Sequence, residues 1–247
     1  MWQKGCERSQ PPCPAVSKMR PMNQRPTNKF KARRANPRVS LVEKAYAGIK
    51  HNIVTTAYAP GAYLNEVQIS EEMGIGRTPV HHALHRLAQE SLVEIVPRKG
   101  VIVRPISLDE IAHIIEVRLV NEPHCAAQAA SRVTQSTLEE SKACLAQAAA
   151  ELEGDGDVEK LMALDCQFHN WISRAAGNFV MEGILSQLQD RSARFWFLSL
   201  SDADHSHRVQ EQHTEILQAI AARDPKAAAD AARRHIESFR NTILRVI

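Results

Sequence analysis

Apolar residues recur at helical spacing through most of this chain, and strand-like alternation is confined to one short stretch. The spacing i, i+3, i+4, i+7 and i+8 is occupied by Val80, Ala83, Leu84, Leu87 and Ala88, which predicts a helix with one buried face. Residues 92–96 and 101–104 are predicted to be strands on either side of a Pro-Arg-Lys-Gly turn. No alternation follows residue 104, so the rest of the chain is predicted to be all-α.

The segment before the striped helix predicts a helix-turn-helix. Apolar residues at 67, 69 and 73 indicate a short helix that ends at Gly74. Thr78 suits the N-cap of the next helix, and Pro79 suits its first position, where a missing N–H costs nothing. Two short helices joined by a glycine turn and followed by a β-hairpin are typical of a winged helix that reads DNA.

The residues expected to meet DNA lie in two places. One is the polar face of the second helix, with His81, His82 and His85 after Arg77, Thr78 and Pro79 at its start. The other is the basic hairpin tip, which can touch a phosphate or the minor groove and consists of Arg98, Lys99 and Gly100.

This stretch resembles the GntR superfamily of winged-helix transcription regulators. The resemblance covers about residues 41–104 and rests on Gly-Ile-Gly-Arg-Thr-Pro-Val at 74–80, Ala-Leu-x-Arg-Leu at 83–87 and the Lys-Gly pair of the wing. It implies that Arg77, Thr78, position 81 and Gly100 lie against DNA. Because His81 stands where the family usually has arginine, the resemblance does not imply an operator sequence.

Composition divides the chain further. Residues 1–40 hold ten Lys/Arg and one acidic residue, whereas the whole chain of 247 residues has a formal net charge of only +3. This basic, proline-rich stretch has no apolar periodicity and is predicted to be a disordered arm that attracts phosphates. The winged helix then covers 41–104, a linker 105–107 and a helical domain 108–247. Within that domain, helices are predicted at 108–117, 119–132, 137–153, 157–175, 179–199, 206–222 and 225–245.

The predicted compartment is the bacterial cytoplasm, in association with the nucleoid. The sequence has no run of about 18 apolar residues and no apolar core of a secretory signal. Its five cysteines have no CxxC spacing, which favours reduced thiols. We therefore expect no membrane association.

Four residues of the helical half form a candidate metal site. Asp165 and His169 lie four residues apart, on one face of a predicted helix. His213 and His235 each lie eleven residues from Asp224, so an antiparallel hairpin that turns there brings them to one level. One carboxylate and three imidazoles suit zinc, nickel or manganese. Taken alone, each histidine has the alternative of an ordinary surface or core position, which we assign to His51, His113, His124, His205 and His207.

The same half resembles the FCD ligand-binding domain of the FadR-type subfamily. The matching words are Glu-Val-Arg at 116–118, Asp-x-x-Phe-His at 165–169, Arg-x-x-x-x-His at 208–213, and His235. The resemblance implies that these four residues hold a divalent cation, zinc first, which a small carboxylate then completes. It also implies that Arg118 clamps that carboxylate. The alternative for Arg118 is a salt bridge to Glu122 or Glu116.

The sequence therefore predicts a non-enzymatic, ligand-responsive transcription regulator of mainly α fold. The resemblance further implies a repressor that binds a palindromic operator in double-stranded DNA as a homodimer. Two alternatives remain open: a metallohydrolase with an accessory winged helix, and a DNA-binding protein whose metal is purely structural. No HExxH motif or nucleophile elbow supports the hydrolase.

Overall fold

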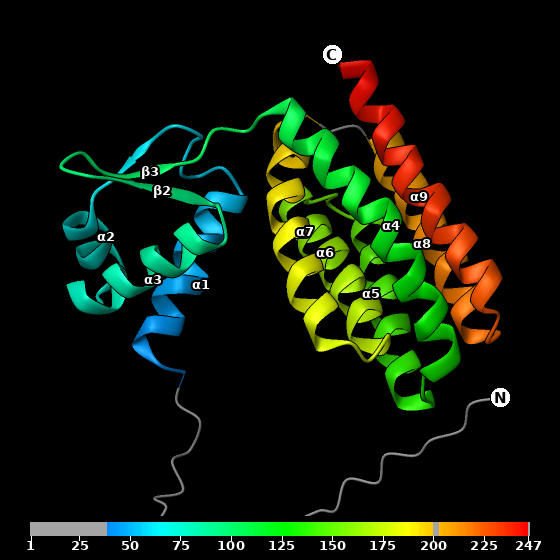
Figure 1. The fold of residues 1–247 in the computed structure, drawn as a ribbon. Helices are drawn as coiled ribbons and strands as arrows, with labels where there is room; N and C mark the ends of the chain where they lie inside the picture. Colours follow the sequence, from blue (N-terminus) through cyan, green and yellow to red (C-terminus); the bar gives the residue numbers. More distant parts are fainter. Residues whose placement is uncertain (1–38, 200–202, 247) are drawn as a thin grey trace, which may run out of the picture. The chain divides into compact units, whose positions relative to one another are not determined.

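The computed structural model describes residues 39–199 and 203–246. The predicted arm of residues 1–40 lies outside this range except for its last two residues. The elements in chain order are α1 (Leu41–Val54), β1 (Tyr63–Leu64), α2 (Glu66–Met73), α3 (Arg77–Gln89), β2 (Val93–Val96), β3 (Gly100–Val103), α4 (Leu108–Arg132), α5 (Gln135–Glu153), α6 (Val158–Ala175), α7 (Phe179–Ser199), α8 (Ala203–Ala221) and α9 (Pro225–Val246). Figure 1 shows this order from blue to red.

Helices α1 and α2 pack against α3, which buries its apolar stripe. Val80, Ala83, Leu84 and Leu87 are fully buried against α1 and the sheet, as predicted. The α2 helix ends at Gly74, whose backbone is left-handed with φ 61°, a conformation that glycine adopts without the cost of a Cβ. This turn leaves the polar face of α3 uncovered.

The predicted start of α3 was wrong by two residues. The helix begins at Arg77 with Gly76 as its N-cap, so Thr78 and Pro79 are its second and third residues. Ser70 donates its hydroxyl to the Ile75 carbonyl, which stabilises the turn that precedes the helix. Pro79 still lies where backbone N–H groups have no partner within the helix, so it does not break α3.

The wing is part of a three-stranded antiparallel sheet of order β1-β3-β2. β2 and β3 each begin one residue away from the predicted position, and the two-residue β1 was not predicted. Val96 pairs with Gly100 across the tip. Gly100 has φ 104°, a backbone conformation that residues other than glycine rarely adopt.

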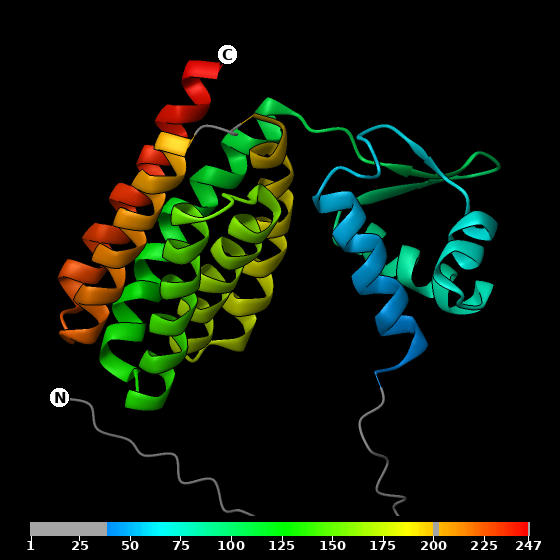
Figure 2. The same ribbon diagram turned by 180° about the vertical axis from the view of Figure 1, so that it is seen from behind.

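Beyond β3 the described chain is entirely helical, as predicted. Figures 1 and 2 show α8 and α9 side by side from both directions, and α4 also packs on α9. Phe168, Trp171 and Ile216 belong to the main core of this half. In the described residues, no helix has the length and apolar character needed to cross a bilayer.

Several helix bounds differ from the prediction, and α6 starts at Val158 rather than 157 and α8 at Ala203 rather than 206. The expected helices 108–117 and 119–132 are one helix, α4, which continues through Arg118 and contains Pro123. Both residues are buried, and burial of this length of helix outweighs the cost of an internal proline, about 3 kcal/mol. The α5 helix starts at Gln135 rather than 137, because Thr134 forms a capping box with Thr137.

Candidate functional site

The α8–α9 hairpin brings His213 and His235 together. Asp224 ends the turn, and its carboxylate oxygen accepts a hydrogen bond from the Ala227 backbone N–H at 2.9 Å. This contact stabilises the exposed first turn of α9. The imidazole rings of His213 and His235 lie 4.7 Å apart between centroids, and both are buried.

The α6 helix adds His169 and Asp165 from the facing side. His169 Nε2 lies 3.3 Å from His235 Nε2. Asp165 Oδ1 lies 3.5 Å from His213 Nε2 and 3.9 Å from His169 Nε2. The three histidines each offer a nitrogen, and these atoms all lie within 4.8 Å of one another. The three histidines are buried, and the half-buried Asp165 lies beside two of them, so the four predicted ligands lie in one cluster, which we call the His₃Asp centre.

Two hydrogen bonds orient the imidazoles toward the middle of the His₃Asp centre. Glu122 Oε2 lies 2.9 Å from His169 Nδ1, and Gln212 Oε1 lies 2.9 Å from His235 Nδ1. Because both oxygens can accept, a ring in its neutral form carries its proton on Nδ1 and offers Nε2 as a lone pair. With both rings in this form, the two Nε2 atoms face each other 3.3 Å apart, an arrangement that suits a cation held between them.

Two atoms of the His₃Asp centre, on Asp165 and His213, lack a hydrogen-bond partner among the described residues. Gln189 donates its side-chain N–H to Asp165 Oδ2 at 2.8 Å. The other oxygen, Asp165 Oδ1, and His213 Nε2 are both buried and make no hydrogen bond among the described residues. Buried polar atoms without partners are costly. A divalent cation accepts electron pairs from both, so the donor set fits a metal ion.

Burial and neighbouring charges together set the protonation states of the groups in the His₃Asp centre. Burial, together with the neighbouring positive groups, holds the pKa of His213 and His235 well below the ordinary value, so both rings are neutral and able to ligate. Burial also raises the pKa of Asp165. For Glu122, burial opposes ionisation, but the charge of Arg118 and the hydrogen bonds from His169 and Arg118 outweigh it and hold its pKa well below the usual range.

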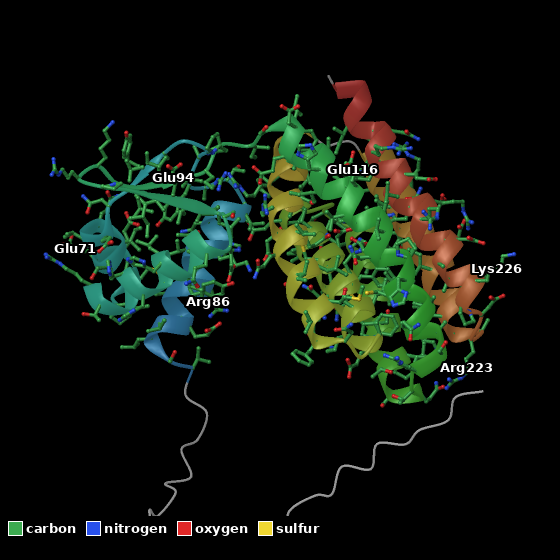
Figure 3. The ribbon with its side chains drawn as sticks, viewed as in Figure 1. Glu71, Arg86, Glu94, Glu116, Arg223 and Lys226 are labelled. Atoms are coloured by element: carbon green, nitrogen blue, oxygen red, sulfur yellow. The ribbon has the colours of Figure 1, made fainter. Side chains whose placement is uncertain are left out.

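Arg118 is buried beside the His₃Asp centre and is paired there. Its Nε donates to Glu122 Oε1, which is the salt bridge considered as the alternative to a ligand clamp. Its role as a carboxylate clamp stays a prediction. Glu116, labelled on α4 in Figure 3, is exposed and forms no such pair among the described contacts.

Three residues of this site were not singled out from the sequence as parts of a metal centre. Glu122 was considered only as a partner for Arg118, although its position four residues after Arg118 places both side chains on the same face of α4. Gln189 and Gln212 gave no sequence signal, because a glutamine on an amphipathic helix is usually a surface residue.

The predicted DNA-contacting residues lie on two exposed parts of the winged helix. Arg77, Thr78, His81, His82 and His85 are exposed on α3, and Pro79 is partly exposed. The wing residues Arg98, Lys99 and Gly100 are exposed as well. His81 pairs with Glu66 of α2 at 3.0 Å, and its ring centroid lies 4.4 Å from that of His85.

Arg86 of α3, labelled in Figure 3, is held by α1 instead of being free for DNA. Its Nη1 lies 2.8 Å from Glu43 Oε2, and its guanidinium lies 3.5 Å from the centroid of the Tyr46 ring. This contact fixes the angle between α1 and α3, and so supports the orientation of the exposed face.

These features define a DNA-binding transcription regulator: an exposed polar helix and a basic wing are joined to a helical half that contains a buried cluster of three histidines. The chain belongs to the GntR family. The sequence model described as "Bacterial regulatory proteins, gntR family" matches residues 41–103, and the FCD domain matches residues 113–238.

Curated relatives are similar along most of their length. The HTH-type transcriptional repressor RspR of Escherichia coli K12 is 25% identical over 211 residues, which cover 85% of this chain and 92% of RspR. The Nta operon transcriptional regulator of Aminobacter aminovorans is 26% identical over 196 residues, or 78% and 90% of the two chains.

Among solved structures, E. coli McbR/YncC has a similar fold, with a TM-score of 0.75 at 21% identity over 84% of this chain and 99% of McbR/YncC. The comparisons indicate a transcription regulator and not an enzyme, so the metallohydrolase alternative is set aside.

Proposed function

We propose that this regulator binds a divalent metal ion at the His₃Asp centre and a small carboxylate on that metal, and that the carboxylate changes its affinity for DNA. Zinc is the first choice, with nickel and manganese as alternatives. The observation that carries the proposal is the convergence of His169 Nε2, His235 Nε2, His213 Nε2 and Asp165 Oδ1 in a buried cluster where two of these atoms have no hydrogen-bond partner.

The metal has an expected role beyond holding the bundle together. A purely structural site is closed by protein ligands. Here a cavity reaches Asp165 and His213 from between α5, α6, α7 and α8, which favours an exchangeable position for an outside ligand. Arg118 is the proposed second contact for the carboxylate, and its guanidinium would then bind both the ligand carboxylate and Glu122.

The DNA-reading unit in this proposal is residues 41–104, followed by the 105–107 linker and the 108–247 effector domain. A homodimer would place two α3 helices in successive major grooves of a palindromic operator on the bacterial chromosome. Repression is the proposed outcome, since RspR is named a repressor.

The α7 helix supports a route from ligand to DNA. Gln189 holds Asp165, and the next residue, Asp190, forms an ion pair with Lys50 of α1. Adjacent residues of a helix point about 100° apart, so two neighbouring positions of α7 contact α6 and α1 at the same height along the helix. Lys50 also lies 3.4 Å from Glu90, which directly follows α3.

Metal removal tests the proposal. Protein stripped with a chelator and then titrated with Zn²⁺ should gain about 2.7 kcal/mol at a free concentration of 100 Kd, a rise in Tm of roughly 5–10 °C for a domain of this size. His213→Ala should lose most of that rise. Equal melting with and without Zn²⁺, Ni²⁺ and Mn²⁺ would contradict the metal centre.

Binding to duplex fragments from the protein's own genomic neighbourhood, measured by fluorescence anisotropy, tests the regulatory part. Light scattering of the complex should give two chains per fragment.

A further inference from the structure

The cavity beside the His₃Asp centre is narrow and lies between four helices. Its volume is about 50 Å³. Asp165 and His213 line it. The cavity thus reaches the proposed metal from one side and has room for a thin molecule.

The rest of the lining is apolar. Leu145 and Ala148 of α5, Leu161 of α6, and Trp196 of α7 are among its walls. Gln210 and Ser206 are the exceptions, and the Gln210 side-chain N–H is already donated to the Leu145 carbonyl at 2.8 Å.

The lining has no positive side chain. None of the lining residues that the structure describes is Lys or Arg, and Asp165 is the lining carboxylate. Two arginines of α7 point elsewhere: Arg191 pairs with Glu110, and Arg194 donates to the Arg104 carbonyl. A second carboxylate or a row of hydroxyls on a ligand would lie here without partners, which is costly.

We infer that the effector is a monocarboxylic acid with a slender apolar tail, and that its tail occupies this cavity while its carboxylate binds at the His₃Asp centre. This inference rests on the proposed metal site. It excludes dicarboxylates and polyhydroxy acids as strong ligands, because the lining has no Lys or Arg to pair with a second carboxylate, and Ser206 is the one lining hydroxyl among the described residues.

The test has two arms on the full chain. Zn²⁺ binding is first measured by competition with a chromophoric chelator. The zinc-loaded protein is then titrated calorimetrically with acetate, butanoate and hexanoate, and with succinate and gluconate. Affinity should rise roughly fourfold for each added CH₂ until the cavity is full, and succinate and gluconate should bind no better than acetate.

A matched pair of variants locates the tail. Ala148 lines the cavity, whereas Ala146 is exposed on the same helix. Ala148→Leu should weaken hexanoate at least tenfold and leave acetate and Zn²⁺ affinity within about twofold, on the basis that leucine fills the tail's space. Ala146→Leu should change none of the three.

The outcomes separate the two claims. If Zn²⁺ does not bind, the proposed metal site fails and the inference fails with it. If Zn²⁺ binds but affinity is independent of tail length, or succinate binds most tightly, the tail inference is overturned while the metal site stands. Equal loss of hexanoate and acetate binding in Ala148→Leu would also overturn it.

Discussion

Glu122 Oε2 accepts a hydrogen bond from His169 Nδ1 at 2.9 Å, so a carboxylate of α4 sets the tautomer of a histidine on α6. The same Glu122 side chain also holds Arg118. One buried acid therefore fixes two groups that the sequence links to ligand binding.

Glu122→Gln is expected to lower Zn²⁺ affinity about 10–100-fold, the usual cost of losing the partner of a metal-bound imidazole. The reason is that a neutral amide is a weaker acceptor for His169 Nδ1–H and leaves Arg118 without its counter-charge. Competition with a chromophoric chelator measures the affinity, and circular dichroism checks folding.

Glu116→Gln is the matched control for that variant, because Glu116 is exposed on the same helix. It should leave Zn²⁺ affinity unchanged. An unchanged affinity in Glu122→Gln would show that the carboxylate does not position His169 for a metal.

Asp224→Ala is expected to destabilise the protein by about 0.5–2 kcal/mol, since it removes the acceptor for the Ala227 N–H at the start of α9. Chemical denaturation with and without Zn²⁺ measures the loss. Asp224→Asn keeps an acceptor oxygen and should recover most of it. Equal losses in the two variants would mean that the cap is not what stabilises the hairpin.

Lys99→Ala is expected to weaken DNA binding to all sequences by a similar factor, and to reduce the slope of log affinity against log salt by about 1, as for one lost phosphate contact. Lys99 lies exposed at the wing tip. Lys226 on α9, labelled in Figure 3, supplies the control variant Lys226→Ala. A salt slope that stays the same in Lys99→Ala would place the wing away from the phosphates.

Asp190→Asn is expected to uncouple effector from DNA. The change removes the charge that pairs with Lys50 but keeps the size of the side chain. Zn²⁺ affinity should stay the same, and the ratio of DNA affinities with and without a bound acid should fall toward 1. Couplings of this kind are worth about 1–3 kcal/mol, so the ratio in the unsubstituted protein should be roughly 5–150. A ratio that is unchanged in Asp190→Asn would exclude this ion pair as the route.

The amino-acid sequence by itself determined the class of each half and which helix positions of the proposed metal ligands lie at the same height. The apolar stripe of α3 and the i, i+4 spacing of Asp165 and His169 are properties of a single helix, so periodicity reveals them. The hairpin at Asp224 is equally local, because residues equally far from the turn of an antiparallel hairpin face each other.

Only the tertiary structure decided which side chains support those ligands. Gln189 and Gln212 come from different helices, and their contacts depend on how each helix is rotated against its neighbours, which no spacing within one helix fixes. The cavity is lined by side chains of four helices, so it exists only once those helices have packed. Local pattern sets the elements, whereas side-chain packing between them sets the chemistry of the site.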